Sequence, residues 1–273
     1  DSSLDLPGFD IDSVQNATEE VDDSELELEP QYSIYTFPRG ARPGTFLHTV
    51  FEEIDFTAAV DCPETVAKLT ELLQLENYEL AWLPVLQQLI QDVLTCALDG
   101  DTLRLADKTA SQRLTEMEFL LPIEILQAVA LNKIIAKHDP LSAKAGELGF
   151  ATVSGMLKGF IDLVFEHQGK YYVLDWKSNY LGDDPQVYRG EQLKTAMREH
   201  RYDLQYQIYA LALQRFLRSR IPNYSYETHF GGVYYLFLRG IQAGSDSGIF
   251  YARPSEQLLD ELDLLMKGAL PHA

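Results

Sequence analysis

The chain has 273 residues, 46% of them hydrophobic, and a formal net charge of −20 at pH 7. This apolar content suffices for one large core or two small ones and excludes a disordered or fibrous protein. No apolar run approaches the roughly 20 residues that span a bilayer, so we expect no membrane partner. Two cysteines, Cys62 and Cys96, are too few for a disulfide framework or an iron–sulfur cluster, and the N-terminus lacks the order of a secretory signal. We therefore expect a cytoplasmic protein with buried thiols.

The negative charge is concentrated at the N-terminus. Residues 1–30 contain eleven acidic residues and no Lys or Arg, which predicts an acidic, disordered linker or tail. Between Arg189 and Arg220 the balance reverses, with seven basic residues against three acidic ones. We therefore expect a single folded domain over 31–273 that keeps a locally basic face.

The first elements predicted along the chain are helical. A turn-rich loop at 37–44 precedes a helix from about residue 45, and two more helices are expected at about 63–74 and 80–98. A strand at 112–121 would carry Glu116 and Glu118 on one face, and a helix near 123–137 would follow it. These elements predict a helical N-terminal part over about 44–137.

The second half of the chain alternates strands and helices. It predicts a β-hairpin at 152–178, helices at about 186–199 and 202–219, strands at 232–238 and 248–253, and a last helix at 255–267. The order of helices and strands predicts one α/β domain.

The hairpin is the most informative segment. If Gln168-Gly169 forms a two-residue turn, each cross-strand pair sums to 337, which places Asp162 opposite Asp175. Alternation places Lys177 on the same face as Asp175. The opposite face is apolar and predicts a core surface made of Ile161, Leu163, Phe165, Tyr172, Leu174 and Trp176.

Two like charges that face each other destabilise a hairpin, and a divalent cation between them removes the repulsion. Mg²⁺ prefers one or two carboxylates together with water and phosphate oxygens. The ammonium of Lys177 would then orient or deprotonate an attacking water and offset charge on a phosphate. The alternative reading is a surface hairpin whose Asp and Lys form a weak solvated ion pair.

Three motifs give the chain a family likeness, namely Gly159-Phe-Ile-Asp162, Asp175-Trp-Lys177 and Gln205-Tyr-Gln-Ile-Tyr209. Together they resemble the RecB-family branch of the PD-(D/E)XK nucleases, and most closely its RecB-type C-terminal nuclease domains. The likeness covers roughly residues 35–253. It implies a restriction-endonuclease-like core at about 112–253, with a mixed central sheet flanked by helices, followed by the C-terminal helix at about 255–267.

The resemblance also implies a metal site. It makes His48 a ligand beside Asp162, Asp175 and the backbone carbonyl of Trp176. It favours Glu116 over Glu118 as a further carboxylate, although both are expected on one face. The implied cofactor is Mg²⁺, with Mn²⁺ as a substitute and Ca²⁺ as an inhibitory mimic.

Contacts to DNA are expected from the helix at 202–219 and the basic segment before it. The resemblance implies that Gln205 and Tyr209 lie beside the active site and position the scissile strand. Their spacing places them on one helical face with Arg198 and Tyr202, while Leu204, Ile208 and Leu211 would pack inward. Arg198 and Arg201 suit phosphate contacts, and Tyr202 or Tyr206 could stack on an unpaired base.

The resemblance implies a nuclease that acts on single-stranded DNA or duplex ends within an exonuclease V of RecB, RecC and RecD, with RecA as a further partner. The chain has no Gly-x-x-x-x-Gly-Lys-[Ser/Thr] motif, so we expect no ATP site in it. Two alternatives stay open. One is a freestanding PD-(D/E)XK endonuclease, and the other is a non-catalytic docking domain for RecA or sister subunits.

Overall fold

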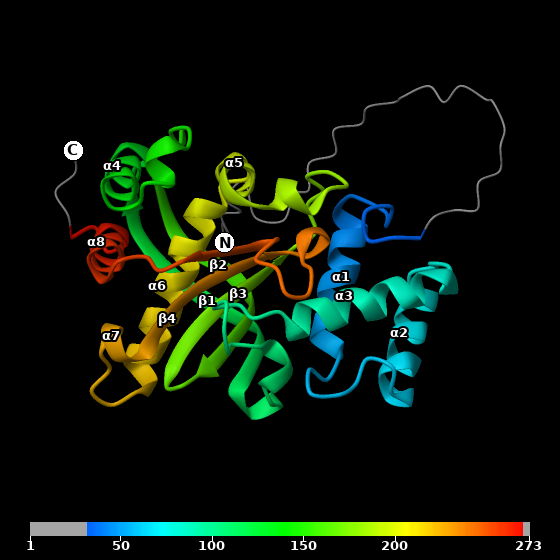
Figure 1. The fold of residues 1–273 in the computed structure, drawn as a ribbon. Coiled ribbons are helices and arrows are strands. Elements are labelled where there is room, and N and C mark those ends of the chain that lie inside the picture. The colour runs from blue at the N-terminus through cyan, green and yellow to red at the C-terminus, as the bar shows by residue number, and fades with distance from the viewer. Residues whose placement is uncertain (1–31, 270–273) are drawn as a thin grey trace, which may run out of the picture.

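A mixed five-stranded sheet in the order β1-β2-β3-β4-β5 forms the centre of the protein (Figure 1). The computed structural model describes residues 32–269, so the predicted acidic tail at 1–30 lies outside the described residues. Only the β3–β4 pairing is parallel, and the other pairings are antiparallel. The strands are β1 Arg113–Leu126, β2 Val153–His167, β3 Lys170–Lys177, β4 Phe230–Phe237 and β5 Ile249–Ala252.

Helices cover both faces of this sheet. Figure 1 shows α1, α2 and α3 gathered on one side, with α4, α6 and α8 on the other. The α-helices are α1 Ala41–Glu53, α2 Pro63–Leu75, α3 Leu83–Thr95, α4 Ala128–His138, α5 Gly190–Glu199, α6 Tyr202–Arg220, α7 Tyr226–His229 and α8 Glu256–Met266. Short 3₁₀ turns lie at Leu80–Trp82, Leu105–Asp107, Ala110–Gln112, Ser142–Lys144, Pro185–Tyr188 and Leu238–Gly240. None of the helices within 32–269 has the length and apolarity that a membrane crossing needs.

The sheet separates two hydrophobic cores. One core joins α1, α2 and α3 to side chains such as Leu174 and Trp176 on β3. The other joins α4, α5, α6 and α8 to side chains such as Val173 on β3 and Tyr235 on β4. Because alternate residues of a strand point to opposite faces, β3 contributes to both cores, and its charged residues must also be placed on one side or the other.

Three predicted boundaries were wrong. Strand β1 does not end at residue 121 but continues to Leu126, and the following helix begins at Ala128. Alternating burial persists past Pro122 because β1 is an edge strand, where a proline removes no ladder hydrogen bond. The first helix begins at Ala41, since Pro43 and Gly44 fit into its first turn. The single helix expected at 80–98 is a 3₁₀ turn followed by α3.

Helix α6 departs most from its expected pattern. The sequence predicted one face turned toward DNA while Leu204, Ile208 and Leu211 packed inward, yet every residue from 202 to 214 is buried. The helix packs between the sheet and α5 and α8, so its polar side chains also face protein. Such a helix must satisfy its buried polar groups internally.

The β1–β2 pair changes face near one residue. Thr115 pairs with Leu163 and Met117 pairs with Ile161, but Leu163 lies in the core with α1 and Ile161 in the core with α6. Between them Glu116 has a φ of 50°, in the left-handed region. The expectation that Ile161 shares a core face with Leu163 was therefore wrong, because this backbone irregularity interrupts the alternation.

Arg239 fastens the start of the folded domain to the sheet. Its side chain is 1% exposed and donates to four backbone carbonyls. Nε donates to Ser178 O at 2.9 Å, and the Nη atoms donate to Ile34 O, Phe37 O and Pro38 O at 2.6, 3.0 and 2.7 Å. The planar guanidinium therefore joins residues 34–38 to the end of β3.

We expect Arg239→Ala to lower the free energy of unfolding by about 3 kcal/mol or more, because it leaves several buried carbonyls without donors. Arg239→Lys should restore only part of the loss, since one ammonium cannot reproduce the fork of donors. Urea unfolding curves measure both variants. A loss below about 1 kcal/mol for Arg239→Ala would contradict this role.

Candidate active site

Asp175 and Lys177 form a buried ion pair at the C-terminal end of β3. They alternate with Trp176, which packs in the core with α1, so both side chains point to the α6 side of the sheet. Asp175 is 2% exposed and Lys177 is 4% exposed, and Lys177 Nζ lies 2.6 Å from Asp175 Oδ2. Asp175 Oδ2 nevertheless lacks a well-directed hydrogen bond. It is thus a buried oxygen with charge compensation but with room for a further partner.

Asp162 lies next to this pair at the point where the hairpin ladder ends. The predicted register is confirmed from His167 opposite Lys170 to Leu163 opposite Leu174. Asp162 and Asp175 do not continue this ladder, so the expected direct pairing stops one step short of them. The backbone N–H of Trp176 instead donates to Asp162 Oδ2 at 2.8 Å.

Helix α1 brings His48 to the same place. His48 Nδ1 lies 3.4 Å from Asp162 Oδ2. One turn later on α1, the ring of Phe51 stacks on Trp176 with ring centroids 4.4 Å apart and planes at 19°. Because this stack fixes α1 against the strand that carries Asp175, it also fixes the histidine near both aspartates.

The pKa values report this crowding. Burial, and then the charge of Asp162, raise the pKa of Asp175 to about 7, although Lys177 lowers it. Burial lowers the pKa of His48. The hydrogen bond to Asp162 and the charge of Asp162 raise it by more than burial lowers it, so the pKa of His48 is about 9. Burial also lowers the pKa of Lys177, but the charges of Asp175, Tyr202 and Asp162 together with the hydrogen bond to Asp175 exceed that effect and raise it. The nearest basic side chain is thus His48 for Asp162 and Lys177 for Asp175.

The donor set fits a divalent cation. Two carboxylates and an imidazole converge here, and burial together with the charge of Asp162 raises the pKa of Asp175, so the charged form of Asp175 is disfavoured. A cation would offset both charges. Within 32–269 no three His, Cys, Asp or Glu residues are gathered closely enough to hold a metal by themselves. Mg²⁺ does not need such a cage, because it commonly keeps several waters and takes only one or two carboxylates.

The structure separates the two glutamates that the sequence left open. Glu118 pairs with Lys158 at 3.0 Å on the exposed side of the β1–β2 pair. Glu116 instead lies at the backbone irregularity opposite Asp162 and hydrogen-bonds to Glu52. Burial, and after it the charge of Asp162, raise the pKa of Glu52, while His48 lowers it. Sequence reasoning missed Glu52, although its position four residues after His48 on one helix was the available signal.

Gln205 and Tyr209 belong to a buried hydrogen-bond chain beneath the aspartates. Tyr235 OH donates to Gln205 Oε1 at 3.0 Å, and Gln205 Nε2 donates to Tyr209 OH at 3.0 Å. Tyr235 is opposite Asp175 in the parallel β3–β4 register, so the chain starts beside the ion pair. Sequence reasoning missed Tyr235 because it lies within an apolar run that predicts only a core strand.

Packing explains why a glycine stands at position 159 in the first family motif. It pairs with Phe119 across β1 and β2, and a Cβ atom on it would lie 2.5 Å from the Phe119 ring. That ring meets Tyr209 edge-on, with centroids 5.7 Å apart. The glycine therefore allows Phe119 to support the tyrosine at the far end of the hydrogen-bond chain.

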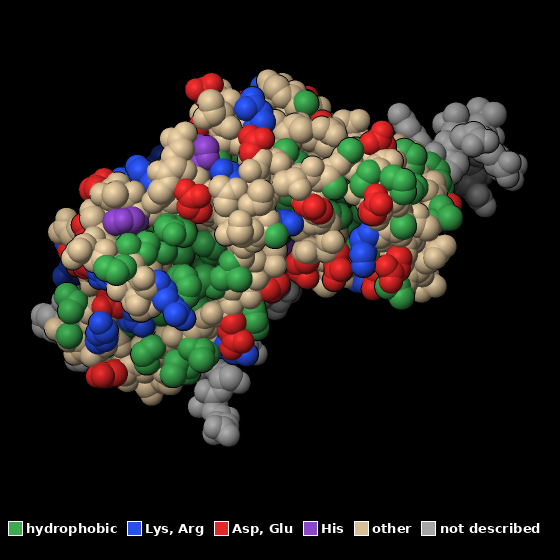
Figure 2. Space-filling view, turned by 90° about the horizontal axis from the view of Figure 1, so that it is seen from below, with side chains coloured by type: hydrophobic (Ala, Val, Ile, Leu, Met, Phe, Trp, Pro, Cys, Tyr) green, Lys and Arg blue, Asp and Glu red, His purple; other side chains and the backbone are tan. Residues whose placement is uncertain are grey.

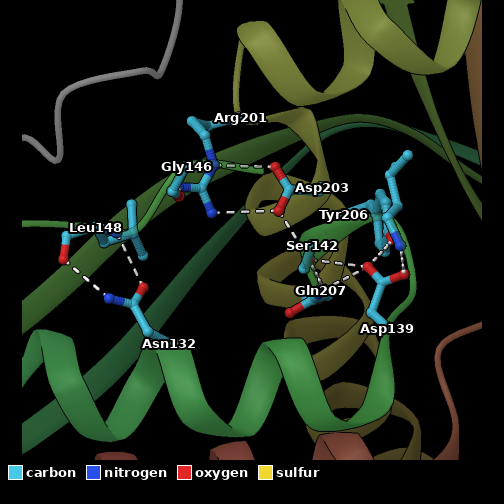
Figure 3. A network of polar contacts seen from close by, with 10 residues as sticks. Asn132, Asp139, Ser142, Gly146, Leu148, Arg201, Asp203, Tyr206 and Gln207 are labelled. Carbon is cyan, nitrogen blue, oxygen red and sulfur yellow. Dashed lines mark hydrogen bonds and ion pairs between the residues drawn. The ribbon is translucent and has the colours of Figure 1, made fainter. Parts of the chain in front are cut away.

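Tyr202, Gln205 and Tyr209 share helix α6 as expected, but Arg198 does not join their face, because the chain breaks between α5 and α6. Arg198 belongs to α5, and Arg201 adopts a φ of 55° at the joint. Arg201 is held there by Asp203 and by Gly146 O, which Figure 3 shows together with the neighbouring contacts of Ser142 and Gln207.

The basic segment 189–220 is largely neutralised by neighbours. Six of its seven basic residues pair with a carboxylate, while Arg220 lies over the ring of Phe216. On the face seen in Figure 2, basic side chains are scattered among acidic ones. The local excess of positive charge in the sequence therefore does not produce a continuous basic face.

Arg198, Arg201 and Gln205 nevertheless converge on one cavity of about 450 Å³. Its walls are mostly apolar and come from α4, α6, α8 and the loop at 146–150, with side chains such as Leu148 and Ile208. The cavity adjoins the hydrogen-bond chain at Gln205. Three of the residues expected to contact DNA thus line one hollow that reaches the hydrogen-bond chain at Gln205.

We expect Lys177→Met to lower the free energy of unfolding by roughly 3–5 kcal/mol, because it leaves the Asp175 carboxylate buried without its cation. The double variant Asp175→Asn/Lys177→Met should recover much of this loss, since no buried charge remains. Urea unfolding in metal-free buffer measures the cycle. Additive losses from the two substitutions would mean that the two side chains do not depend on each other.

Comparison with known proteins gives a consistent family. Residues 24–268 match the family model of the PD-(D/E)XK nuclease superfamily. The chain is 48% identical over 265 residues to the RecBCD enzyme subunit RecB of Escherichia coli K12. The aligned region covers 96% of this chain and 22% of that protein. It is 41% identical over 237 residues to RecB of Haemophilus influenzae, and the aligned region covers 86% of this chain and 19% of that protein. It is 32% identical over 267 residues to RecB of Mycobacterium tuberculosis H37Rv, and the aligned region covers 85% of this chain and 24% of that protein. The chain thus spans about a fifth of the length of these relatives.

Proposed function

The chain belongs to the PD-(D/E)XK nuclease superfamily, as a homologue of the nuclease region of RecB, and from this premise we propose that it hydrolyses phosphodiester bonds in DNA. The observation that carries the proposal is the convergence of Asp162, Asp175, Lys177 and His48 at the end of the central strand. An acidic pair with an adjacent ammonium suits phosphoryl chemistry, in which catalysis is mostly positioning and charge stabilisation.

Members of this family typically depend on a divalent metal. We propose that Asp162, Asp175 and His48 hold the cation, together with the backbone carbonyl of Trp176. Mg²⁺ suits the carboxylates, Mn²⁺ suits the added imidazole, and Ca²⁺ would bind without supporting cleavage. When bound, the cation supplies Lewis-acid stabilisation of the phosphate and lowers the pKa of water.

The protein's own side chains then have distinct tasks. Lys177 remains an ammonium, because the charges and the hydrogen bond around it together raise its pKa in spite of burial, and it offsets negative charge that develops on the scissile phosphate. Gln205 and Tyr209 position the substrate strand through groups already oriented by Tyr235. Glu116 and Glu52 add negative charge on the α1 side and help to attract the cation.

We assign DNA contact to the cavity rim rather than to a basic face. Arg198 and Arg201 line the cavity next to Gln205 and would hold backbone phosphates without reading base sequence. Most basic side chains nearby are already paired, and the net charge of the chain is −20. The isolated chain should therefore bind DNA weakly and lose activity steeply with salt.

For the longer protein, we propose the role that the names of the relatives suggest. This chain would be the nuclease part of a RecBCD-type exonuclease V, acting on single strands or duplex ends in double-strand-break repair, with RecC, RecD and RecA as partners. The motor activity of such a complex would lie outside this chain, which lacks a phosphate-loop motif.

Cleavage assays on end-labelled single-stranded and duplex DNA at low salt test the activity. We expect Asp162→Asn, Asp175→Asn and Lys177→Met each to reduce the rate at least about 100-fold, because each removes a group that holds the cation or offsets phosphate charge. EDTA should abolish cleavage, and Ca²⁺ should not restore it. Thermal unfolding of each variant confirms that the loss is measured on folded protein.

A matched pair of variants separates the site from its surroundings. Glu116→Gln should slow cleavage, whereas Glu118→Gln, whose carboxylate only pairs with exposed Lys158, should cleave at the wild-type rate. Wild-type activity in Asp175→Asn would refute the proposed mechanism. Discrete products from plasmid DNA would favour a freestanding endonuclease, and failure to bind Mn²⁺ in calorimetry would favour a docking domain.

An exchange experiment tests the proposed context. We expect the corresponding region of E. coli RecB, when replaced by this chain, to support DNA degradation by the complex with RecC and RecD. The physical reason is that a 48% identical domain should keep both the site and the surfaces around it. An assembled complex that unwinds but does not degrade DNA would contradict the assignment. The same exchange carrying Lys177→Met is the negative control.

A further inference from the structure

The ammonium of Lys177 lies against two aromatic rings as well as against Asp175. Its Nζ atom is 4.0 Å from the ring centroid of Tyr202 and 5.3 Å from that of Tyr235. All these side chains are buried. A cation over an aromatic face gains attraction from the ring quadrupole, and the gain is larger when water is excluded. Asp175 and Tyr202 thus restrain the flexible lysine side chain through different interactions.

Tyr202 is itself held firmly. Its hydroxyl donates to Asn179 Oδ1 at 3.1 Å, and its ring stacks on that of His200 with centroids 5.3 Å apart and planes at 19°. Asn179 Nδ2 and His200 Nε2 lie 3.4 Å apart, so the two residues that contact Tyr202 also contact each other. Phe237 meets the ring from β4, with centroids 6.3 Å apart.

The backbone joint before Tyr202 sets the direction of the ring. Tyr202 is the first residue of α6 and follows Arg201, whose left-handed conformation turns the chain between α5 and α6. Arg201 Nε and Nη2 donate to Asp203 at 3.1 and 3.2 Å, and its Nη1 donates to Gly146 O at 2.7 Å (Figure 3). Asp203 is fully buried and also accepts from Ser142. The tyrosine therefore starts from a fixed point of the backbone.

We propose that Tyr202 is a positioning residue for Lys177 and does not stack on DNA. One face of its ring is already occupied by the ammonium and the ring also stacks on His200, so neither interaction leaves the ring to a base. The ring restrains Nζ without accepting a conventional hydrogen bond, so the ammonium protons not directed to Asp175 stay available to the scissile phosphate. This inference rests on the proposed nuclease function, in which Lys177 acts on that phosphate.

Kinetics of two substitutions test the role. Tyr202→Phe keeps the ring and should keep kcat within about threefold of wild type. Tyr202→Leu keeps an apolar side chain but removes the ring, and kcat should fall about 30-fold, a factor that corresponds to about 2 kcal/mol for a desolvated cation–π contact. The KM for DNA should stay unchanged in both. A raised KM with an unchanged kcat in Tyr202→Leu would overturn the proposal and show base stacking instead.

A control variant and a direct measurement exclude a purely structural effect. Tyr226→Leu removes another buried tyrosine ring, near the opposite end of β4 from Lys177. The kcat of this variant should match that of the wild type. In protein carrying ¹³C-lysine, the ε-methylene resonance of Lys177 should be shifted upfield mainly by the Tyr202 ring, and this shift should become much smaller in Tyr202→Leu, where only the more distant Tyr235 ring remains, and persist in Tyr202→Phe. An unshifted resonance in the wild type would overturn the proposal. If wild type showed the shift but cleaved no DNA, the proposed function would fail while the contact stood.

Discussion

A carboxylate and an ammonium buried together at the end of the central strand constrain the rest of the molecule. Neither Asp175 nor Lys177 could stay charged there alone, because desolvation would outweigh any other contact. Each therefore requires the other, and both require walls that exclude water without filling the site. Helices α1 and α6 supply these walls from opposite faces of the sheet. The two-core architecture is thus coupled to the chemistry that it surrounds.

The two layers contribute different chemistry. From one side α1 brings an imidazole and a carboxylate, His48 and Glu52, next to Asp162. From the other side α6 brings neutral hydroxyl, amide and ring groups that hold Lys177 and orient one another. The change of face at Glu116 allows β2 to serve both layers, since Asp162 lies where the alternation is interrupted.

The sequence predicted the local part of this arrangement well. The turn at Gln168-Gly169 fixed the hairpin register, because a period of two and an apolar face leave one pairing that buries the correct residues. Prediction failed where the outcome depends on distant segments. Helix α6 was expected to turn one face toward DNA, but partners from the sheet and from α5 and α8 surround it. Tyr202 is therefore buried, and Arg189, Arg215 and Arg218 pair with carboxylates of distant segments that no local pattern identifies.

The attachment of Arg239 has a mechanical consequence. This one guanidinium joins residues 34–38, at the start of the described chain, to Ser178, the residue that directly follows Lys177. Tension or rotation applied to the chain at residues 34–38 would pass through a single planar side chain to the backbone beside Lys177. A displacement of this segment is thus coupled to the position of the buried ion pair at the end of β3.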